Sequence, residues 1–150
     1  MSPTDLLICQ IEFGTPEYDQ AVALRYEVLR KPLGLNYSPE QLAEEYDQIH
    51  LTAYDPGQKL LAYLNLTRKD EATFKMRQVA VAPEAQGKGV GASLVAESER
   101  LVARLGARQM TLHARETAVA FYLKQGYRIE GESFEEVGIP HRLMCKDLGD

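Results

Sequence analysis

Hydrophobic and polar side chains alternate near the start of the chain, in residues 7–13. A period of two puts every second side chain on one face, so this segment is predicted to be a β-strand with one buried face. Later apolar runs are separated by turn-forming residues, of which Asp55–Gln58 is the strongest signal. Six further strands are predicted, at residues 49–54, 60–67, 74–81, 110–114, 127–131 and 139–146.

Two segments near the N-terminus carry helix signals instead. Thr15 is a good N-cap, and the proline that follows it suits the first helical position. Residues 38–41 (Ser-Pro-Glu-Gln) form a capping box, which opens a second short helix ending near Tyr46. The first of these helices has one apolar stripe, made of Tyr18, Val22, Tyr26 and Leu29.

Two more helices are predicted in the second half of the chain. One runs from about Gly89 to Leu105, and Gly106 ends it. The other follows Thr117, a plausible N-cap, and Gly126 is placed to end it as the C′ residue.

The predicted element order is β-α-α-β-β-β-α-β-α-β-β. It describes an α+β fold around a mixed, mostly antiparallel sheet, with one parallel crossover between Val81 and Met110. No repeat or linker divides the sequence, so residues 1–150 are expected to form a single domain.

Composition narrows the function classes only a little. Hydrophobic residues make up 45% of the chain and charged residues 26%, as in ordinary globular domains. The net charge of −5 comes without any basic run, which disfavours nucleic acid as a partner. No stretch is long enough to span a membrane, and Met1–Asp5 lacks the features of a signal peptide. A cytoplasmic location is therefore expected.

The cysteines and histidines do not suggest a metal site. Cys9 and Cys145 lie in strands at opposite ends of the chain, without the spacing of a zinc motif. The histidines at positions 50, 113 and 141 are also widely separated. No metal cofactor is expected.

The most informative segment is residues 86–91, Gln-Gly-Lys-Gly-Val-Gly, which joins a predicted strand to a predicted helix. Glycine allows the backbone to approach a ligand closely, because no Cβ stands in the way. The first N–H groups of a helix are unpaired and carry the positive end of the helix dipole, an arrangement that binds phosphate. This loop is therefore a candidate pyrophosphate site.

Two familiar phosphate loops match this segment poorly. A P-loop needs Ser or Thr after its Gly-Lys pair, but Gly89 follows Lys88. A dinucleotide fingerprint needs an acidic residue about 20 residues further on, and residues 107–114 contain none. A glycine-rich turn without any ligand stays open as the alternative.

A third pattern, Gln/Arg-x-x-Gly-x-Gly/Ala, matches fully at Gln86, Gly89 and Gly91. It resembles the pyrophosphate loop of the GNAT superfamily of acetyl-CoA-dependent N-acyltransferases. About thirty residues later, Phe121-Tyr122 followed by Gly126-Tyr127 resembles the second signature of that family. The predicted element order also resembles the GNAT core over nearly the whole chain.

The resemblance implies acetyl-CoA as co-substrate and an amine of a small molecule or peptide as acceptor, attacked directly. It implies that the strand residues Val79, Ala80 and Val81 pair with the pantetheine arm as an added strand would. The pyrophosphate would lie on backbone N–H groups, and Gln86 and Lys88 could add side-chain contacts. The implied cofactor loop comprises Gln86, Gly87, Lys88, Gly89, Val90, Gly91 and Ala92.

By the same resemblance, Tyr122 would protonate the departing thiolate, a role that suits a neutral phenol. Packing of its ring on the sheet is the alternative. Many family members place Asn after the strand equivalent to residues 110–114, whereas this chain reads Arg115-Glu116-Thr117. Thr117 is the candidate replacement for that contact to the cofactor.

The acceptor side is less specified by the sequence. His141 follows a rigid Gly-Ile-Pro segment, similar to one found in small bacterial GNAT proteins, and is the candidate base. Glu136 is a candidate contact for a cationic amine, whereas Arg25 and Arg30 would suit an anionic group. Each of these residues could instead be structural or solvated. A non-catalytic acyl-CoA-binding module, a nucleotide-binding protein and a homodimer also stay open.

Overall fold

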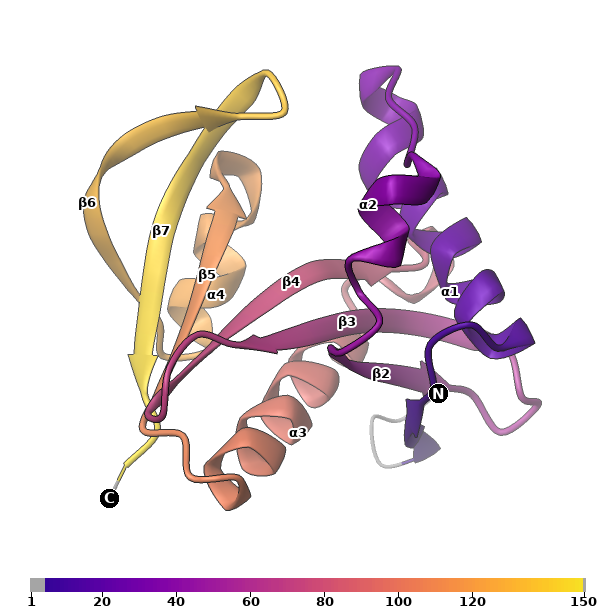
Figure 1. Cartoon of the computed structure of the whole chain (residues 1–150), viewed down its shortest axis with the longest axis horizontal. Coiled ribbons are helices and arrows are strands. Elements are labelled where there is room, and N and C mark those ends of the chain that lie inside the picture. The colour runs from indigo at the N-terminus through magenta and orange to yellow at the C-terminus, as the bar shows by residue number, and fades with distance from the viewer. Residues whose placement is uncertain (1–4, 150) are drawn as a thin grey trace.

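The computed structural model describes residues 5–149 (Figure 1). The first four residues of the N-terminal segment that was tested for a signal peptide lie outside the described residues. The strands are β1 (Leu7–Ile11), β2 (Ile49–Tyr54), β3 (Leu60–Arg68), β4 (Thr73–Val81), β5 (Gln109–Arg115), β6 (Arg128–Glu136) and β7 (Ile139–Asp147). The helices are α1 (Pro16–Arg25), α2 (Pro39–Ala43), α3 (Val90–Arg104) and α4 (Val119–Lys124).

All seven strands form one sheet in the order β1-β2-β3-β4-β5-β7-β6. Every neighbouring pair is antiparallel except β4 and β5, which run parallel because α3 connects them as a crossover. The predicted element order and the single parallel connection are therefore confirmed.

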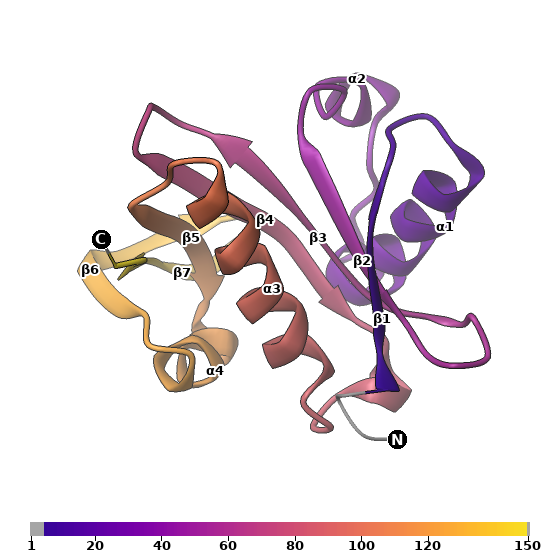
Figure 2. The ribbon, with the colours of Figure 1, turned by 90° about the horizontal axis from the view of Figure 1, so that it is seen from below.

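The sheet divides into two arms that diverge between β4 and β5 (Figure 1). Helices α3 and α4 cover one face, and α1 lies on the other, over β3 and β4, with α2 on the same side as α1 (Figure 2). The main apolar core lies between α3 and the sheet, where burial of large side chains supplies the principal driving force for folding. Its fully buried members include Leu64, Leu66, Met76, Leu94, Val95, Val102, Met110, Leu112 and Met144.

Two helix starts were predicted correctly from their caps. The hydroxyl of Thr15 accepts a hydrogen bond from the N–H of Tyr18, and Pro16 occupies the first turn of α1. Ser38 and Gln41 exchange both hydrogen bonds of a capping box at the start of α2.

The first helix does not continue regularly to Leu29 as its apolar stripe suggested. After Arg25 the chain forms a π-helical turn, Tyr26–Arg30, and then a short 3₁₀ turn, Lys31–Leu33. Pro32 accounts for the change, because a proline lacks an N–H and its ring crowds the carbonyl four residues earlier in an α-helix.

The predicted N-cap of the fourth helix was wrong. Thr117 lies within a 3₁₀ turn, Glu116–Ala118, and α4 begins only at Val119 without a side-chain cap. The reason is that β5 extends to Arg115, so these three residues are used to turn the chain. The end was correct, because Gly126 follows α4 with a φ of 95°.

Candidate active site

The parallel strands β4 and β5 are paired over only part of their length. Their register runs from Thr73 opposite Gln109 to Met76 opposite Leu112 and stops there. Both strands continue beyond this point, so the backbone of each is free of the other where they separate. A cavity of about 180 Å³ occupies the separation, and its wall includes Leu29, Arg30, Val79, His113, Arg115, Ala118, Tyr122, Glu136 and His141.

A bulge at Gln78 marks the point where β4 leaves β5. Gln78 has a φ of 56°, and the pairing of β4 with β3 shifts register between Tyr63 and Asn65. An extra residue in one strand increases the local twist and redirects the strand. The side-chain oxygen of Gln78 accepts a hydrogen bond of 2.5 Å from the Tyr37 hydroxyl, which ties this unusual residue to the chain before α2.

The glycine loop follows β4 after a short 3₁₀ turn, Pro83–Ala85, and leads into α3. Gly87 and Gly89 have φ values of 76° and 83°, and both are exposed, as is Lys88 between them. The side-chain amide of Gln86 donates a hydrogen bond of 3.0 Å to the Val81 carbonyl, so in this structure it fixes the loop to the end of the strand. The loop therefore presents its backbone to solvent at the start of a fifteen-residue helix.

Gly91 is needed for a different reason. It is buried in the first turn of α3, and a Cβ there would lie 3.2 Å from the Val81 side chain and 3.4 Å from the Phe121 ring. The absence of a Cβ at Gly91 lets β4, α3 and α4 meet closely at the loop. Val90 beside it is also buried, whereas Ala92 is half-buried.

The three strand residues predicted to contact the cofactor do not share one face. Val79 lines the cavity, and Val81 contacts α3 at Gly91. Ala80 is buried and pairs across the sheet with Tyr63, on the opposite side. Thr117 is exposed and does not line the cavity, although the adjacent Ala118 does.

Tyr122 comes from α4 and forms part of the cavity wall. It is 6% exposed, and its ring makes edge contacts with Phe121 and Tyr127. Burial raises the pKa of the Tyr122 phenol, so this group stays protonated at neutral pH. It can therefore act both as packing for the short helix and as a proton donor.

Glu136 lies between two histidines on the other wall of the cavity. Its carboxylate is 2.9 Å from Nδ1 of His113 and 3.7 Å from Nε2 of His141. Burial alone would raise the pKa of Glu136, but the His113 hydrogen bond and the two imidazoles outweigh it and lower the pKa. Glu136 is therefore ionised and attractive to a cationic group.

His141 is held in one orientation. Its ring is 3% exposed and stacks beside Phe134, and its Nδ1 lies 3.0 Å from the Ile139 carbonyl. A carbonyl only accepts hydrogen bonds, so Nδ1 must be the protonated nitrogen. The lone pair of neutral His141 is then on Nε2, which faces Glu136.

A second cavity of about 220 Å³ adjoins the first. Both are lined by Arg30, Arg77, Gln78, His113 and Glu136, so they form one continuous cleft. The polar end of the cleft is defined here as Arg30, Lys75, Arg77, His113 and Glu136.

Sequence reasoning missed several residues of this polar end. His113, Lys75 and Arg77 carry no motif and are brought together by strand pairing alone. The alternation of Lys75 and Arg77 with buried Phe74 and Met76 along β4 was the available signal, because it showed that the basic pair shares one face.

Arg25, predicted to contact substrate, is instead a structural residue. It is fully buried, and both terminal nitrogens donate hydrogen bonds of 2.7 Å to the carboxylate of Glu45. Burial alone would lower the pKa of Arg25 and raise that of Glu45, but their mutual contact reverses both shifts. A guanidinium committed in this way cannot reach the cleft. Arg30 does line the cleft.

The Arg25–Glu45 pair belongs to a buried polar network between α1 and the sheet. Tyr18 donates a hydrogen bond to Glu45, and Nε2 of His50 lies 3.0 Å from the Glu45 carbonyl. Nδ1 of His50 therefore accepts from the Tyr63 hydroxyl at 2.6 Å. The network fixes α1 and its π-helical turn over β3 and β4. A hydrogen bond of 2.6 Å from Arg115 to the Leu29 carbonyl ties the same turn to β5.

Comparison with known proteins identifies the family. The model of the acetyltransferase (GNAT) domain matches residues 19–148. The chain belongs to the GNAT acetyltransferase family. The uncharacterized N-acetyltransferase YjcF of Bacillus subtilis (strain 168) is 33% identical to this chain over 128 residues, which span 85% of this chain and 90% of YjcF.

Solved structures show the same GNAT fold. An acyl-CoA N-acyltransferase from Pseudomonas aeruginosa superposes with a TM-score of 0.76 at 27% identity, covering 94% of this chain and 99% of that chain. A GNAT family acetyltransferase from Elizabethkingia anophelis with acetyl-CoA bound has a TM-score of 0.73 at 19% identity, covering 95% and 98%.

Other features of the described residues bear on cofactors and membranes. Within residues 5–149, no group of three or more His, Cys, Asp or Glu side chains is arranged to hold a metal ion. Cys9 and Cys145 are both free thiols. Among the helices of this part of the chain, none has the length and apolar character needed to cross a bilayer.

Proposed function

We propose that this GNAT family member transfers an acetyl group from acetyl-CoA to a primary amine of a small molecule or peptide. The observation that carries the proposal is the cleft between β4 and β5, which has Tyr122 and Val79 on its wall, together with the exposed glycine loop that joins β4 to α3. We further propose that the chain works as a single acetyltransferase domain of the small bacterial type, in the cytoplasm.

The residues around the loop fit acetyl-CoA. The unpaired edge of β4 beyond Met76 offers backbone groups to an extended amide chain, with Val79 on the cavity wall beside it. The N–H groups of residues 87–92 open α3 and would hold a pyrophosphate. Lys88 is exposed beside them and would add a charged contact. The co-substrate supplies an activated thioester, and the protein supplies its position.

Tyr122 would act as the general acid. Its raised pKa keeps the proton on the phenol at neutral pH, so the hydroxyl is available to donate to the sulfur as negative charge develops on the departing thiolate. The phenol has no hydrogen-bond partner among the described residues, so its proton is not committed elsewhere.

His141, assisted by Glu136, would accept the proton of the amine. With Nδ1 bound to the Ile139 carbonyl, the basic Nε2 faces the cleft wall where Glu136 lies. Glu136 would attract the ammonium form of the acceptor, and His141 would remove its proton, directly or through one water. Thr117 does not line the cleft, so we assign the role of the family asparagine to backbone groups beside Ala118.

The test combines ligand binding with turnover. Thermal unfolding is measured with acetyl-CoA, CoA, NAD and ATP, because a ligand of the native state raises the midpoint. Thiol release from acetyl-CoA is then measured with a panel of amines. The proposal expects a higher midpoint with acetyl-CoA and CoA, together with amine-dependent thiol release.

Two other results would replace the proposal. Stabilisation by NAD or ATP and not by acetyl-CoA would indicate a nucleotide-binding protein. Stabilisation by acetyl-CoA without thiol release from any amine would indicate an acyl-CoA-binding module.

The base is tested separately with His141→Ala and His141→Gln. If His141 is the base, kcat/KM of the wild type falls as pH is lowered, and both variants lose that dependence while keeping their acetyl-CoA affinity. A variant that unfolds more easily but keeps the wild-type pH profile would make the histidine structural and leave Glu136 or a water as the base.

A further inference from the structure

The charge of the cleft is opposite to that of the molecule. The whole chain carries a net charge of −5. At the polar end of the cleft, however, three cationic side chains, Arg30, Lys75 and Arg77, surround the single carboxylate of Glu136. All three are half-buried, so water and salt screen them less than they screen fully exposed surface charges.

Two of these cations have no carboxylate partner among the described residues. Arg30 lies over the Tyr37 ring, with its guanidinium carbon 4.5 Å from the ring centroid, and forms no ion pair within residues 5–149. In the same part of the chain, the Arg77 side chain forms neither a hydrogen bond nor an ion pair, and the residue opposite it on β3 is the neutral Asn65. Burial, followed by the charge of Arg77, lowers the pKa of Lys75, as expected where positive charges crowd together.

Several other arginines of the described residues are compensated by a carboxylate. Arg25 pairs with Glu45, Arg100 with Glu97, and Arg128 with Glu130. Burying part of a guanidinium group without a carboxylate partner costs free energy, and binding of an anion offsets that cost. Arginine also binds carboxylate and phosphate groups in a bidentate way, which makes a pair of open arginines a specific receptor for such an anion.

The phosphates of the co-substrate do not explain these residues. Arg77 precedes the bulge at Gln78 and pairs with Asn65, whose side chain bonds to Tyr63 on the α1 face of the sheet. The glycine loop instead follows Val81 and packs beside α3 and α4, on the opposite face. The cationic residues therefore face the space left for the acceptor.

We propose that the acceptor is a short amino acid or amino phosphate, with its amine at Glu136 and its anionic group held by Arg30 and Arg77. Lys75 adds charge to the same subsite. Both subsites line one cavity of about 220 Å³, so only a few bonds separate the two groups of the ligand. This assignment rests on the proposed acetyl transfer, and it names the class of amine.

Direct binding tests the inference without relying on turnover. Calorimetry on the CoA-loaded protein compares two matched pairs of amines. β-Alanine and phosphoethanolamine are the anionic members, because each carries a carboxylate or phosphate. Their neutral partners, 3-aminopropionamide and ethanolamine, carry an uncharged amide or hydroxyl in its place. We expect the anionic member of at least one pair to bind at least tenfold more tightly than its neutral partner. The better of β-alanine and phosphoethanolamine separates carboxylate from phosphate recognition.

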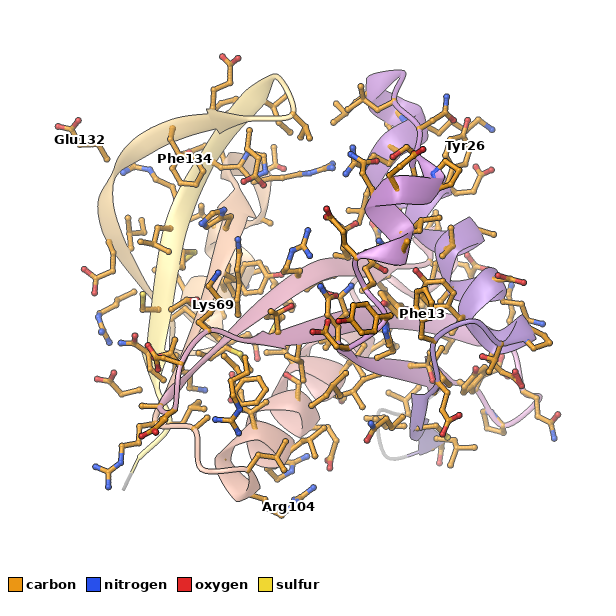
Figure 3. All side chains as sticks on the ribbon, in the orientation of Figure 1. Phe13, Tyr26, Lys69, Arg104, Glu132 and Phe134 are labelled. Carbon is orange, nitrogen blue, oxygen red and sulfur yellow. The ribbon has the colours of Figure 1, made fainter. Side chains whose placement is uncertain are left out.

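Variants locate the subsite. Arg77→Gln and Arg30→Gln should each weaken binding of the anionic ligand by about tenfold or more, since each removes a charge-assisted contact. Binding of the neutral partner and of CoA should stay unchanged. Arg77→Lys should restore part of the affinity, because it returns the charge without the bidentate geometry. Arg104→Gln, at the far end of α3 (Figure 3), is the matched control and should change nothing.

The outcomes separate the two proposals. Equal binding of anionic and neutral partners, or unchanged binding in Arg30→Gln and Arg77→Gln proteins that still bind CoA, overturns the anionic acceptor. Preference for a diamine such as putrescine over β-alanine would also overturn the anionic acceptor, and it would indicate that Glu136 alone selects the ligand. Tight binding of the anionic amine without acetylation would instead count against acetyl transfer and leave the anion subsite standing.

Discussion

The two halves of the proposed site are formed in different ways. The half next to α3, proposed for the co-substrate, consists of backbone: the exposed loop residues 86–89 and the unpaired edge of β4. The polar end consists of side chains from β4, β5, β6 and the π-helical turn, supported by the buried Arg25–Glu45 network. A backbone site depends on where side chains are absent, whereas a side-chain site depends on where distant strands place them. Substitutions should therefore damage the two halves separately.

The largest expected effect is on stability, from Glu45→Ala. This change leaves the Arg25 guanidinium buried without its partner, which should cost about 3–5 kcal/mol in the free energy of unfolding. Urea denaturation measures it. The double variant Arg25→Leu/Glu45→Leu removes both charges and should recover much of the loss. If the double variant is as unstable as the single one, the ion pair is not the origin of the effect.

Gly89→Glu should break the backbone half. Gly89 has a φ of 83°, which residues with a Cβ rarely adopt, and the carboxylate of the new glutamate would repel phosphate groups. We expect acetyl-CoA affinity to fall by about 100-fold or more, by calorimetry on the folded variant. Gly106→Glu is the matched control, since Gly106 has a φ of 98° with open space around it at the other end of α3. It should lose similar stability and keep its acetyl-CoA affinity. Unchanged affinity in Gly89→Glu would exclude the loop as the pyrophosphate site.

Tyr122→Phe should separate chemistry from binding. The substitution removes the phenol hydroxyl, which is the proposed proton donor, and keeps the ring packing with Phe121 and Tyr127. We expect kcat to fall by roughly 100-fold or somewhat less, the lower end of general-acid effects. Acetyl-CoA affinity should barely change. Wild-type turnover in this variant, with chemistry rate-limiting, would assign Tyr122 to packing alone.

These expectations show how far the sequence alone could reach. Gln86, Gly89 and Tyr122 belong to short contiguous motifs that resemble those of the GNAT family, so the sequence alone could propose them as site residues. Arg25 and Arg30 looked alike in sequence because both lie near the end of the first helix. Only the fold places one against Glu45 and the other in the cleft. His113 was passed over because its partner Glu136 is 23 residues away and reaches it only after β5, β7 and β6 have paired.

The smallest expected effect concerns Glu136 and acid. The pKa of Glu136 is lower in the folded state than in the unfolded state. Its contribution to the free energy of unfolding is therefore fully present at pH values above the unfolded pKa, and it is lost as pH falls through the folded pKa. The pair with His113 is partly exposed, so Glu136→Gln should cost less than about 1 kcal/mol at pH 7. Urea denaturation at pH 7 and at about pH 3.5 should show this difference shrinking with acid.

Glu132→Gln is the control for that comparison, because Glu132 lies on the same strand and points away from the sheet (Figure 3). It should show no difference from wild type at either pH. A Glu136→Gln difference that grew with acid would mean that the carboxylate destabilises the fold.

The bulge at Gln78 has a consequence for how this molecule can change over time. The additional residue reverses the face on which odd-numbered residues of β4 lie. Before the bulge Lys75 and Arg77 face away from α3, and after the bulge Val79 and Val81 face toward α3. Under the proposed assignment, substitutions at Lys75 and Arg77 can therefore change which acceptor binds, while Val79 and Val81 keep their orientation toward the co-substrate. Deletion of a single residue at the bulge would do the reverse, because it would turn Val79 and Val81 to the acceptor face in one step.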